Sequence, residues 1–244
     1  MMINIENISL NYALNHLNAH IPRGKLVGIM GANGAGKSTL LKAIAGILPL
    51  AQGEIYFGEK ALSQMSPLEK SRQFAYLAQS SPIYWDLSVS EVIDLALPTF
   101  APKGRQNFSA IYQRFAIEHL LDKPYQTLSG GEKTRVQLAR CGVANTPILL
   151  ADEPIAALDP YYQIDIMQQL KALTPERTCV LAIHHLQLAY EFCDEIILLK
   201  NGNILAAGKT EEVLTEGNLA AAFTIYAEIN RAKREISRIK KSAI

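Results

Sequence analysis

One stretch of nine residues, Gly31-Ala32-Asn33-Gly34-Ala35-Gly36-Lys37-Ser38-Thr39, constrains the fold of this chain more than any other. It follows the apolar run 26–30 and precedes the helix-forming run 40–45, so that a glycine-rich loop joins a strand to a helix. The spacing G-x-x-x-x-G-K-[ST] is typical of a phosphate-binding P-loop. Its glycines let backbone N–H groups turn toward phosphate oxygens, and the following helix N-terminus adds partial positive charge. The stretch therefore predicts a site for a nucleoside triphosphate.

Two side chains at the end of this loop have the chemistry that phosphate transfer needs. Lys37 can place a positive charge between the β- and γ-phosphates, and Ser38 can offer its hydroxyl oxygen to Mg²⁺. We expect the other nucleotide contacts within the loop to come from Gly31, Asn33, Gly34, Ala35, Gly36 and Thr39.

The rest of the chain alternates between apolar strands and helical segments, which predicts an α/β fold with a mostly parallel sheet. Continuous apolar runs are typical of strands buried on both faces, and they occur at 74–77, 148–151, 179–183 and 196–199. Helices are expected between them at 160–173 and 187–192. The turn Asn201-Gly202-Asn203 leads into one further strand at 204–207.

Two regions depart from this alternation. Near the N-terminus, residues 3–8 combine isoleucines with polar neighbours and predict an edge-type strand, and 53–58 predicts another strand closed by a turn. From about 86 to 145 the pattern is helical, and Ser88 and Glu91 form a capping box there. We expect the second region to be an inserted helical subdomain.

Composition excludes several classes of protein. Lys and Arg number 24 against 23 Asp and Glu, so the chain is not built as a nucleic-acid binder. The 3 cysteines show no C-x-x-C spacing and predict buried, reduced thiols rather than a metal site. No apolar run approaches the ~18 residues that a membrane-spanning helix needs.

The C-terminal stretch 218–244 is helix-prone, and from Arg231 onward it is strongly basic. We expect a solvated basic helix face there. The alternative is contact with anionic lipid head groups or with a partner subunit.

Asp152 and Glu153 follow the apolar run 148–151, at the carboxyl end of a predicted buried strand. An acid in that position can reach Mg²⁺ beside the P-loop, and the next acid can polarise a water for in-line attack on the γ-phosphate. Between the P-loop and these acids lies the motif Leu128-Ser129-Gly130-Gly131-Glu132. With this motif the sequence resembles the ATP-binding-cassette (ABC) ATPases, whose signature it reproduces.

The resemblance extends from about residue 3 to residue 215 and implies ATP and Mg²⁺ as cofactors. It implies that Glu153, the Q-loop glutamine Gln79 and the switch histidine His184 are catalytic. The implied ligands of Mg²⁺ are Ser38, Gln79 and Asp152. Outside the P-loop, the implied nucleotide-binding residues are the aromatic Tyr12, the D-loop Asp159, and Ser129, Gly130, Gly131 and Glu132 of the signature motif.

The resemblance also implies the domain organisation: one ABC ATPase domain over 1–244, with a P-loop NTPase (RecA-like) core and an N-terminal antiparallel β part. The nucleotide-binding core would comprise 1–85 and 146–215, and the helical subdomain 86–145 would carry the signature motif. Beyond the part that the resemblance covers, the helix-prone, basic composition predicts a basic helical C-terminal extension at 216–244.

In this family each ATP is held between the P-loop of one subunit and the signature motif of the other, which implies a head-to-tail dimer. One chain has a single P-loop and a single signature, so complete sites require two copies. Some residues depart from the family pattern. His185 replaces a common aspartate after the switch histidine, and Ile155 and Ala156 replace small hydroxyl residues before the D-loop.

Looser similarities at 65–79, 87–92 and 159–163 resemble the subfamily that powers bacterial import of iron–siderophores, haem and vitamin B12. They imply a transmembrane permease that docks near Gln79–Trp85, an indirect solute-binding partner, no nucleic acid, and a location at the cytoplasmic face of the inner membrane. The alternative within the family is a soluble ABC ATPase such as an iron–sulfur cluster assembly factor.

Overall fold

A mostly parallel sheet forms the centre of the computed structural model, which describes residues 2–79, 83, 85–97, 108–156 and 158–241. Within these residues the sheet has six strands in the order β10-β9-β3-β8-β7-β6. β9 and β10 pair antiparallel and the other neighbours pair parallel, as the sequence predicts. The strands are β3 (Leu26–Gly31), β6 (Phe74–Leu77), β7 (Ile148–Asp152), β8 (Thr178–Ala182), β9 (Glu195–Lys200) and β10 (Asn203–Lys209).

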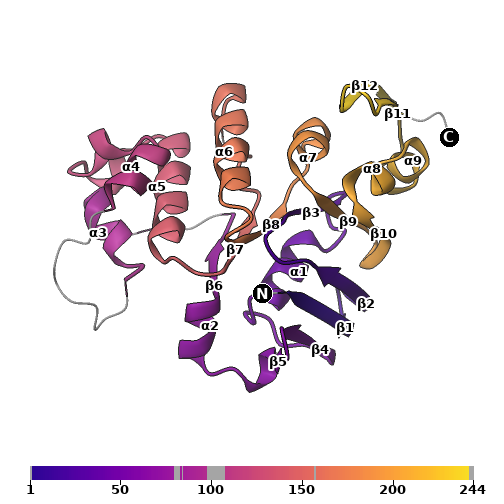
Figure 1. Cartoon of the computed structure of the whole chain (residues 1–244), viewed down its shortest axis with the longest axis horizontal. Helices are drawn as coiled ribbons and strands as arrows, with labels where there is room; N and C mark the ends of the chain where they lie inside the picture. Colours follow the sequence, from indigo (N-terminus) through magenta and orange to yellow (C-terminus); the bar gives the residue numbers. More distant parts are fainter. Residues whose placement is uncertain (1, 80–82, 84, 98–107, 157, 242–244) are drawn as a thin grey trace.

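Helices cover both faces of this sheet (Figure 1). On one face lies α1 (Lys37–Ile44); on the other lie α5 (Gly130–Val143), α6 (Pro160–Ala172) and α7 (Leu186–Phe192). Alternate residues of β3 serve the two cores: Val27 packs on the α1 side and Met30 on the opposite side. Every residue of β3, β7 and β8 is buried, which explains their continuous apolar runs.

A second sheet is antiparallel and shares the core around α1. In the described part of the chain its order is β2-β1-β4-β5, formed by β1 (Ile3–Leu10), β2 (Leu14–Ile21), β4 (Gln52–Phe57) and β5 (Lys60–Ala61). The prediction of an edge strand at residues 3–8 is wrong, because Ile5 is aligned both with Ala19 of β2 and with Ile55 of β4. The polar residues of β1 occupy the outward face of a strand that is paired on both sides.

The described helices of the predicted helical subdomain lie to one side of the central sheet, away from α1, in Figure 1. Its helices are α3 (Val89–Asp94), α4 (Ser109–Arg114) and α5, and α3 packs against α5. The capping box of Ser88 and Glu91 is present at the start of α3. A separate helix, α2 (Pro67–Gln73), precedes β6 and also begins with a capping box, formed by Ser66 and Glu69.

The C-terminal region corrects the sequence prediction. Helices α8 (Thr210–Val213) and α9 (Glu216–Phe223) are followed by a hairpin of β11 (Ile225–Asn230) and β12 (Glu235–Lys241). The predicted helical extension at 216–244 is therefore wrong over 225–241, and residues 242–244 lie outside the described residues. Thr224 ends α9 in a left-handed conformation (φ 57), and the hairpin buries Ala227 and Ile236 against α9 and α7. Tertiary burial outweighs the helix propensity of the many Lys, Arg and Glu residues.

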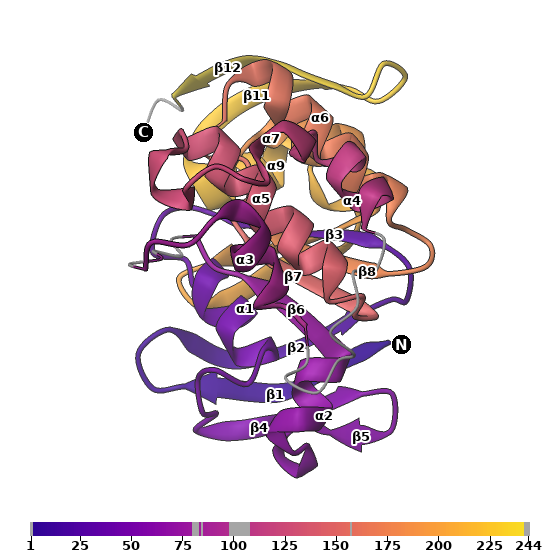
Figure 2. The ribbon, with the colours of Figure 1, turned by 90° about the vertical axis from the view of Figure 1, so that its left-hand side faces the viewer.

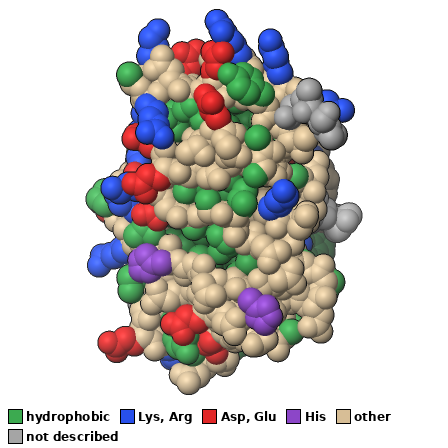
Figure 3. Space-filling view, turned by 90° about the vertical axis from the view of Figure 1, so that its right-hand side faces the viewer, with side chains coloured by type: hydrophobic (Ala, Val, Ile, Leu, Met, Phe, Trp, Pro, Cys, Tyr) green, Lys and Arg blue, Asp and Glu red, His purple; other side chains and the backbone are tan. Residues whose placement is uncertain are grey.

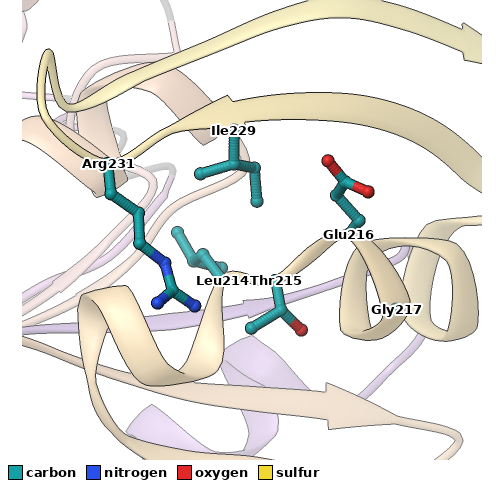
Figure 4. A pocket seen from close by; sticks show the side chains of 6 residues that line it. All are labelled: Leu214, Thr215, Glu216, Gly217, Ile229 and Arg231. Atoms are coloured by element: carbon teal, nitrogen blue, oxygen red, sulfur yellow. The ribbon is translucent and has the colours of Figure 1, made fainter.

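Acidic residues stand among the basic residues of this hairpin, so its surface does not carry charge of a single sign. Figure 3 shows acidic side chains among the Lys and Arg side chains at the upper, C-terminal end of the molecule. The Arg238 guanidinium, for example, pairs with Glu228 at 3.0 Å. A pocket of about 310 Å³ lies between the hairpin and the connection from α8 to α9, and the Arg231 side chain extends into it toward Leu214 (Figure 4). Among the described residues, no helix has both the length and the apolar character that crossing a bilayer requires.

Candidate nucleotide site

The P-loop joins β3 to α1, as the sequence predicts, and its backbone needs glycine. Gly31, Gly34 and Gly36 have φ values of 150°, 79° and 105°, in the region that side chains with a Cβ rarely adopt. A Cβ on Gly31 would lie 2.4 Å from the carbonyl oxygen of Leu199, whereas one on Gly34 would meet nothing within 4 Å. The loop is therefore packed against the sheet on one side and open on the other, where phosphates can approach.

Lys37 lies across this loop. Its Nζ donates hydrogen bonds to the carbonyl oxygens of Gly31 at 3.0 Å and Ala32 at 3.2 Å. The residue is buried, so its charge is held against the backbone of the loop. An anion bound in the loop would meet a positive charge that is already in place.

Ser38 and Asp152 bring two oxygen donors together from α1 and the carboxyl end of β7. The Ser38 hydroxyl donates to Oδ1 of Asp152 at 2.8 Å. Burial raises the pKa of the Asp152 carboxyl, which the Ser38 hydrogen bond opposes and the neighbouring Glu153 charge reinforces. A hydroxyl and a carboxylate are hard ligands of the kind that Mg²⁺ prefers, so these residues fit the ion that the family implies. Mg²⁺ bound there would supply positive charge next to phosphate oxygens.

Gln79, Glu153 and His184 meet just beyond the carboxyl ends of the neighbouring strands β6, β7 and β8. The Gln79 amide donates to Oε2 of Glu153 at 2.9 Å, and Nδ1 of His184 lies 3.9 Å from the same oxygen. The order of parallel strands brings these residues together although they are far apart in the sequence. Glu153 itself has a left-handed backbone (φ 52), and its N–H donates to the carbonyl oxygen of Ala182 at 3.1 Å.

The signature motif forms the start of α5. Ser129 is the N-cap, its hydroxyl accepts a hydrogen bond from the N–H of Glu132 at 3.3 Å, and the Glu132 carboxylate accepts one from the N–H of Ser129 at 2.8 Å. The hydrogen bonds that the Ser129 N–H and hydroxyl donate to the carboxylate lower the pKa of Glu132. Its carboxylate is thus engaged within the chain, while the capping box leaves the N–H groups of Gly130 and Gly131 in the first helical turn unused. No neighbouring atom crowds Gly130.

Two further predicted residues lie on exposed loops or helix ends. Tyr12 is 76% exposed in the turn between β1 and β2 and presents a free ring. Asp159 is the N-cap of α6, where its carboxylate accepts a hydrogen bond from the N–H of Tyr162 at 3.3 Å. His185 caps α7 in the same manner, since its Nδ1 accepts from the N–H of Leu188 at 3.3 Å. The imidazole thereby takes over a capping role that aspartate commonly has.

The predicted permease-docking segment near Gln79–Trp85 is described only in part. Ile83 is buried, Trp85 is 69% exposed, and residues 80–82 and 84 lie outside the described residues. In the D-loop, Ala157 also lies outside them.

One contact with the P-loop was not expected from the sequence. The turn between β9 and β10 reaches the loop, where the N–H of Gly202 donates to the carbonyl oxygen of Ala35 at 3.2 Å. The Asn-Gly pair predicts a turn, but no sequence signal indicates what that turn touches.

Comparison with known proteins gives consistent results. The family model described as ABC transporter matches residues 14–156. The hemin import ATP-binding protein HmuV of Pseudoalteromonas translucida is 38% identical over 236 residues, which cover 91% of this chain and 90% of that protein. The cobalamin import ATP-binding protein BtuD of Halobacterium salinarum is 34% identical over 86% of this chain and 54% of its own length. The dimeric structure of MJ0796, a bacterial ABC transporter cassette, superimposes with a TM-score of 0.77 and 28% identity, covering 85% of this chain and 98% of the cassette.

Proposed function

Since this chain belongs to the ABC transporter family and is an ATPase, we propose that it energises import of an iron complex, such as haem or a siderophore, or of vitamin B12, through a separate membrane permease. The observation that carries the import direction is the similarity to a hemin import ATP-binding protein over about nine-tenths of both chains. The similarity to a cobalamin import protein supports the same class of large, chelated cargo.

Within this proposal, Glu153 is the general base. Its carboxylate polarises a water for in-line attack on the γ-phosphate, while the hydrogen bond from Gln79 orients it. His184 lies near the same carboxylate and contacts the γ-phosphate. Lys37 balances phosphate charge, Ser38 and Asp152 hold Mg²⁺, and Tyr12 stacks on the adenine.

The second half of each ATP site would come from another copy of the chain. Gly130 and Gly131, at the N-terminus of α5, offer backbone N–H groups and helix-end charge to the γ-phosphate held by the partner's P-loop. The dimeric cassette structure supports this arrangement. ATP then joins the two copies, and hydrolysis releases them.

The permease would dock next to Gln79, with Trp85 as an apolar anchor. An exposed tryptophan of this kind is a common centre of a protein interface. The coupling is direct in this proposal, because Gln79 bonds to the base Glu153 at one end of the same segment.

Affinity capture from detergent-solubilised membranes of the native cell tests the proposal. We expect the tagged chain to recover a multi-spanning permease, and Trp85→Ala to lower that recovery at least about tenfold because the interface loses its anchor. Leu205→Ala, which removes an exposed apolar side chain from β10, is the matched control and should recover the permease normally. Recovery of soluble partners alone, with the chain absent from membranes, would contradict import and favour an assembly factor.

A further inference from the structure

Three segments that are distant in sequence meet beside the P-loop: the loop after β1, the P-loop itself, and the turn from β9 to β10. The N–H of Gly202 donates to the carbonyl oxygen of Ala35 at 3.2 Å, and the carbonyl oxygen of Gly202 accepts from the N–H of Asn15 at 2.8 Å. The turn therefore forms a backbone bridge between the phosphate loop and the start of β2.

The packing at this junction leaves no room for side chains. A Cβ on Gly202 would lie 2.5 Å from the carbonyl oxygen of Ala13, and a Cβ on Gly36 would lie 3.0 Å from the same oxygen. Both glycines also have left-handed φ values, 75° and 105°. The carbonyl group of Ala13 is thus clamped between the turn and the P-loop.

Ala13 directly follows Tyr12, the exposed aromatic residue in the proposed adenine position. Because Tyr12 is 76% exposed, few contacts of its own hold its ring in place. The backbone on its C-terminal side is held instead, by the contact of Ala13 with Gly202 and Gly36. The position of the ring relative to the phosphate loop therefore depends on this junction.

We propose that Gly202 is a positioning residue for the nucleotide base: its turn clamps the Tyr12 loop onto the P-loop, so that base stacking and phosphate binding occur at a fixed separation. This inference rests on the proposed role of Tyr12. It extends the site to a turn about 170 residues away from the P-loop in sequence and gives that turn a part in distinguishing a nucleotide from a bare polyphosphate.

Comparing ATP with inorganic tripolyphosphate, each with Mg²⁺, tests the clamp. In Gly202→Ala the new methyl group would lie 2.5 Å from the carbonyl oxygen of Ala13 and 3.1 Å from Nδ2 of Asn15. The half-buried Ala13 must then move, because the hydrogen bond to the buried Ala35 holds the turn to the P-loop. We expect ATP affinity to fall about tenfold, the scale of one lost base–aromatic stack, with tripolyphosphate affinity unchanged. Gly58→Ala is the matched control: it places a Cβ at a left-handed turn (φ 62) between β4 and β5 and should bind both ligands normally.

A double-mutant cycle separates this inference from the function beneath it. In a Tyr12→Ala background, Gly202→Ala should cause no further loss of ATP affinity, because the ring it positions is gone. If Tyr12→Ala weakens ATP binding but Gly202→Ala does not, the clamp is overturned and the role of Tyr12 stands. If Tyr12→Ala leaves ATP binding unchanged, both are overturned.

Two other outcomes are decisive. Equal weakening of ATP and tripolyphosphate by Gly202→Ala would show a general distortion of the P-loop and overturn base positioning. Should Gly202→Ala fail to fold, Asn15→Ala provides the same comparison, since it removes the 3.5 Å hydrogen bond from the exposed Asn15 amide to the carbonyl oxygen of Asn201. A two- to threefold loss for ATP alone is then expected, and no loss would overturn the clamp.

Discussion

Glu153 has a backbone conformation that glutamate rarely adopts. Its φ of 52° is left-handed, which costs an L-residue about 1–2 kcal/mol. The conformation is held by the hydrogen bond from its N–H to Ala182, and it turns the side chain toward Gln79 and His184. Backbone strain of this kind is common at functional sites, where it holds a side chain in the orientation that the chemistry needs.

Replacing the Glu153 carboxylate by an amide tests its role as base. In Glu153→Gln we expect ATP binding to be retained and hydrolysis to fall at least about 100-fold, since an amide cannot accept the proton. Equilibrium ATP binding and phosphate release measure the two effects. Glu191→Gln, on the exposed surface of α7, serves as the control. Turnover like that of the unaltered chain would remove Glu153 as the base.

For individual residues, the sequence predicted which side chains have the chemistry of the site better than it predicted which atoms those side chains contact. The spacing around Lys37 and Ser38 forces a strand–loop–helix geometry, so their places followed from local rules. The capping bonds of Glu132 and His185 were not foreseen, because each depends on a side-chain orientation that the helix start alone does not specify. Their presence leaves the nucleotide contact of Glu132 as a prediction.

At the scale of secondary-structure elements, Asp194 forms hydrogen bonds to two elements that are distant in sequence, α6 and β3. At the border of α7 and β9, its carboxylate accepts hydrogen bonds from Lys171 of α6 at 2.7 Å and from the N–H of Leu26 of β3 at 2.9 Å. Burial alone would raise the pKa of Asp194, but these two hydrogen bonds hold it below its usual value. The bonds therefore stabilise the folded chain while the carboxyl is ionised.

The stability that Asp194 contributes should depend on pH. A lowered folded pKa means that this contribution is present above the ordinary value of 3.8 and is lost as the pH falls through the lower folded value. In Asp194→Asn we expect about 1 kcal/mol less unfolding free energy at pH 7, since both groups are partly exposed.

Urea denaturation across the pH range measures this. The gap in unfolding free energy between Asp194→Asn and the unaltered chain should stay constant from about pH 7 to pH 5 and should narrow below pH 3.8. The exposed Asp122→Asn is the control. A gap that widens toward acid pH would contradict the assigned sign.

Some elements were predicted closely, whereas β2 and the hairpin of β11 and β12 were missed. The strand 74–77 was predicted with its observed ends. β2 was not predicted, because a left-handed residue at His16 and register shifts against β1 break its alternation, leaving Leu14, Leu17 and Ile21 at a spacing unlike that of a strand. Arg238 (φ 50) disturbs β12 in the same way, within a segment rich in helix-forming residues.

At the scale of the whole molecule, the proposal to test is that the signature motif of one copy completes the ATP site of another. Ser129→Arg would place a bulky cation where the partner's ATP is proposed to lie. We expect this variant to bind ATP but to fail to form an ATP-dependent dimer, measured by sedimentation in a Glu153→Gln background. Ser88→Arg is the matched control, because it destroys an equivalent capping box at the start of α3 and costs about as much helix stability. An ATP-bound dimer of Ser129→Arg would contradict the composite site.

The sequence predicted which distant segments lie together only where a recognisable motif marked those segments. Each of three motifs occurs in one structural context: the P-loop, the pair Asp152-Glu153 and the signature motif. Together they predicted the order of the strands, loops and helices that carry them. The contact of Gly202 with Ala35 had no such signal, since it depends on β9 pairing directly with β3 and on the turn that joins β9 to β10.

The separation of the α3–α5 subdomain from α1, seen in Figure 1, has a kinetic consequence. If every complete site borrows its second half from another copy, turnover per chain should rise in proportion to protein concentration in dilute solution and then level off. A permease that holds two copies side by side would replace this bimolecular encounter by an effective concentration in the millimolar range. Freely diffusing copies would then be nearly idle, and ATP would be consumed chiefly where cargo can be moved.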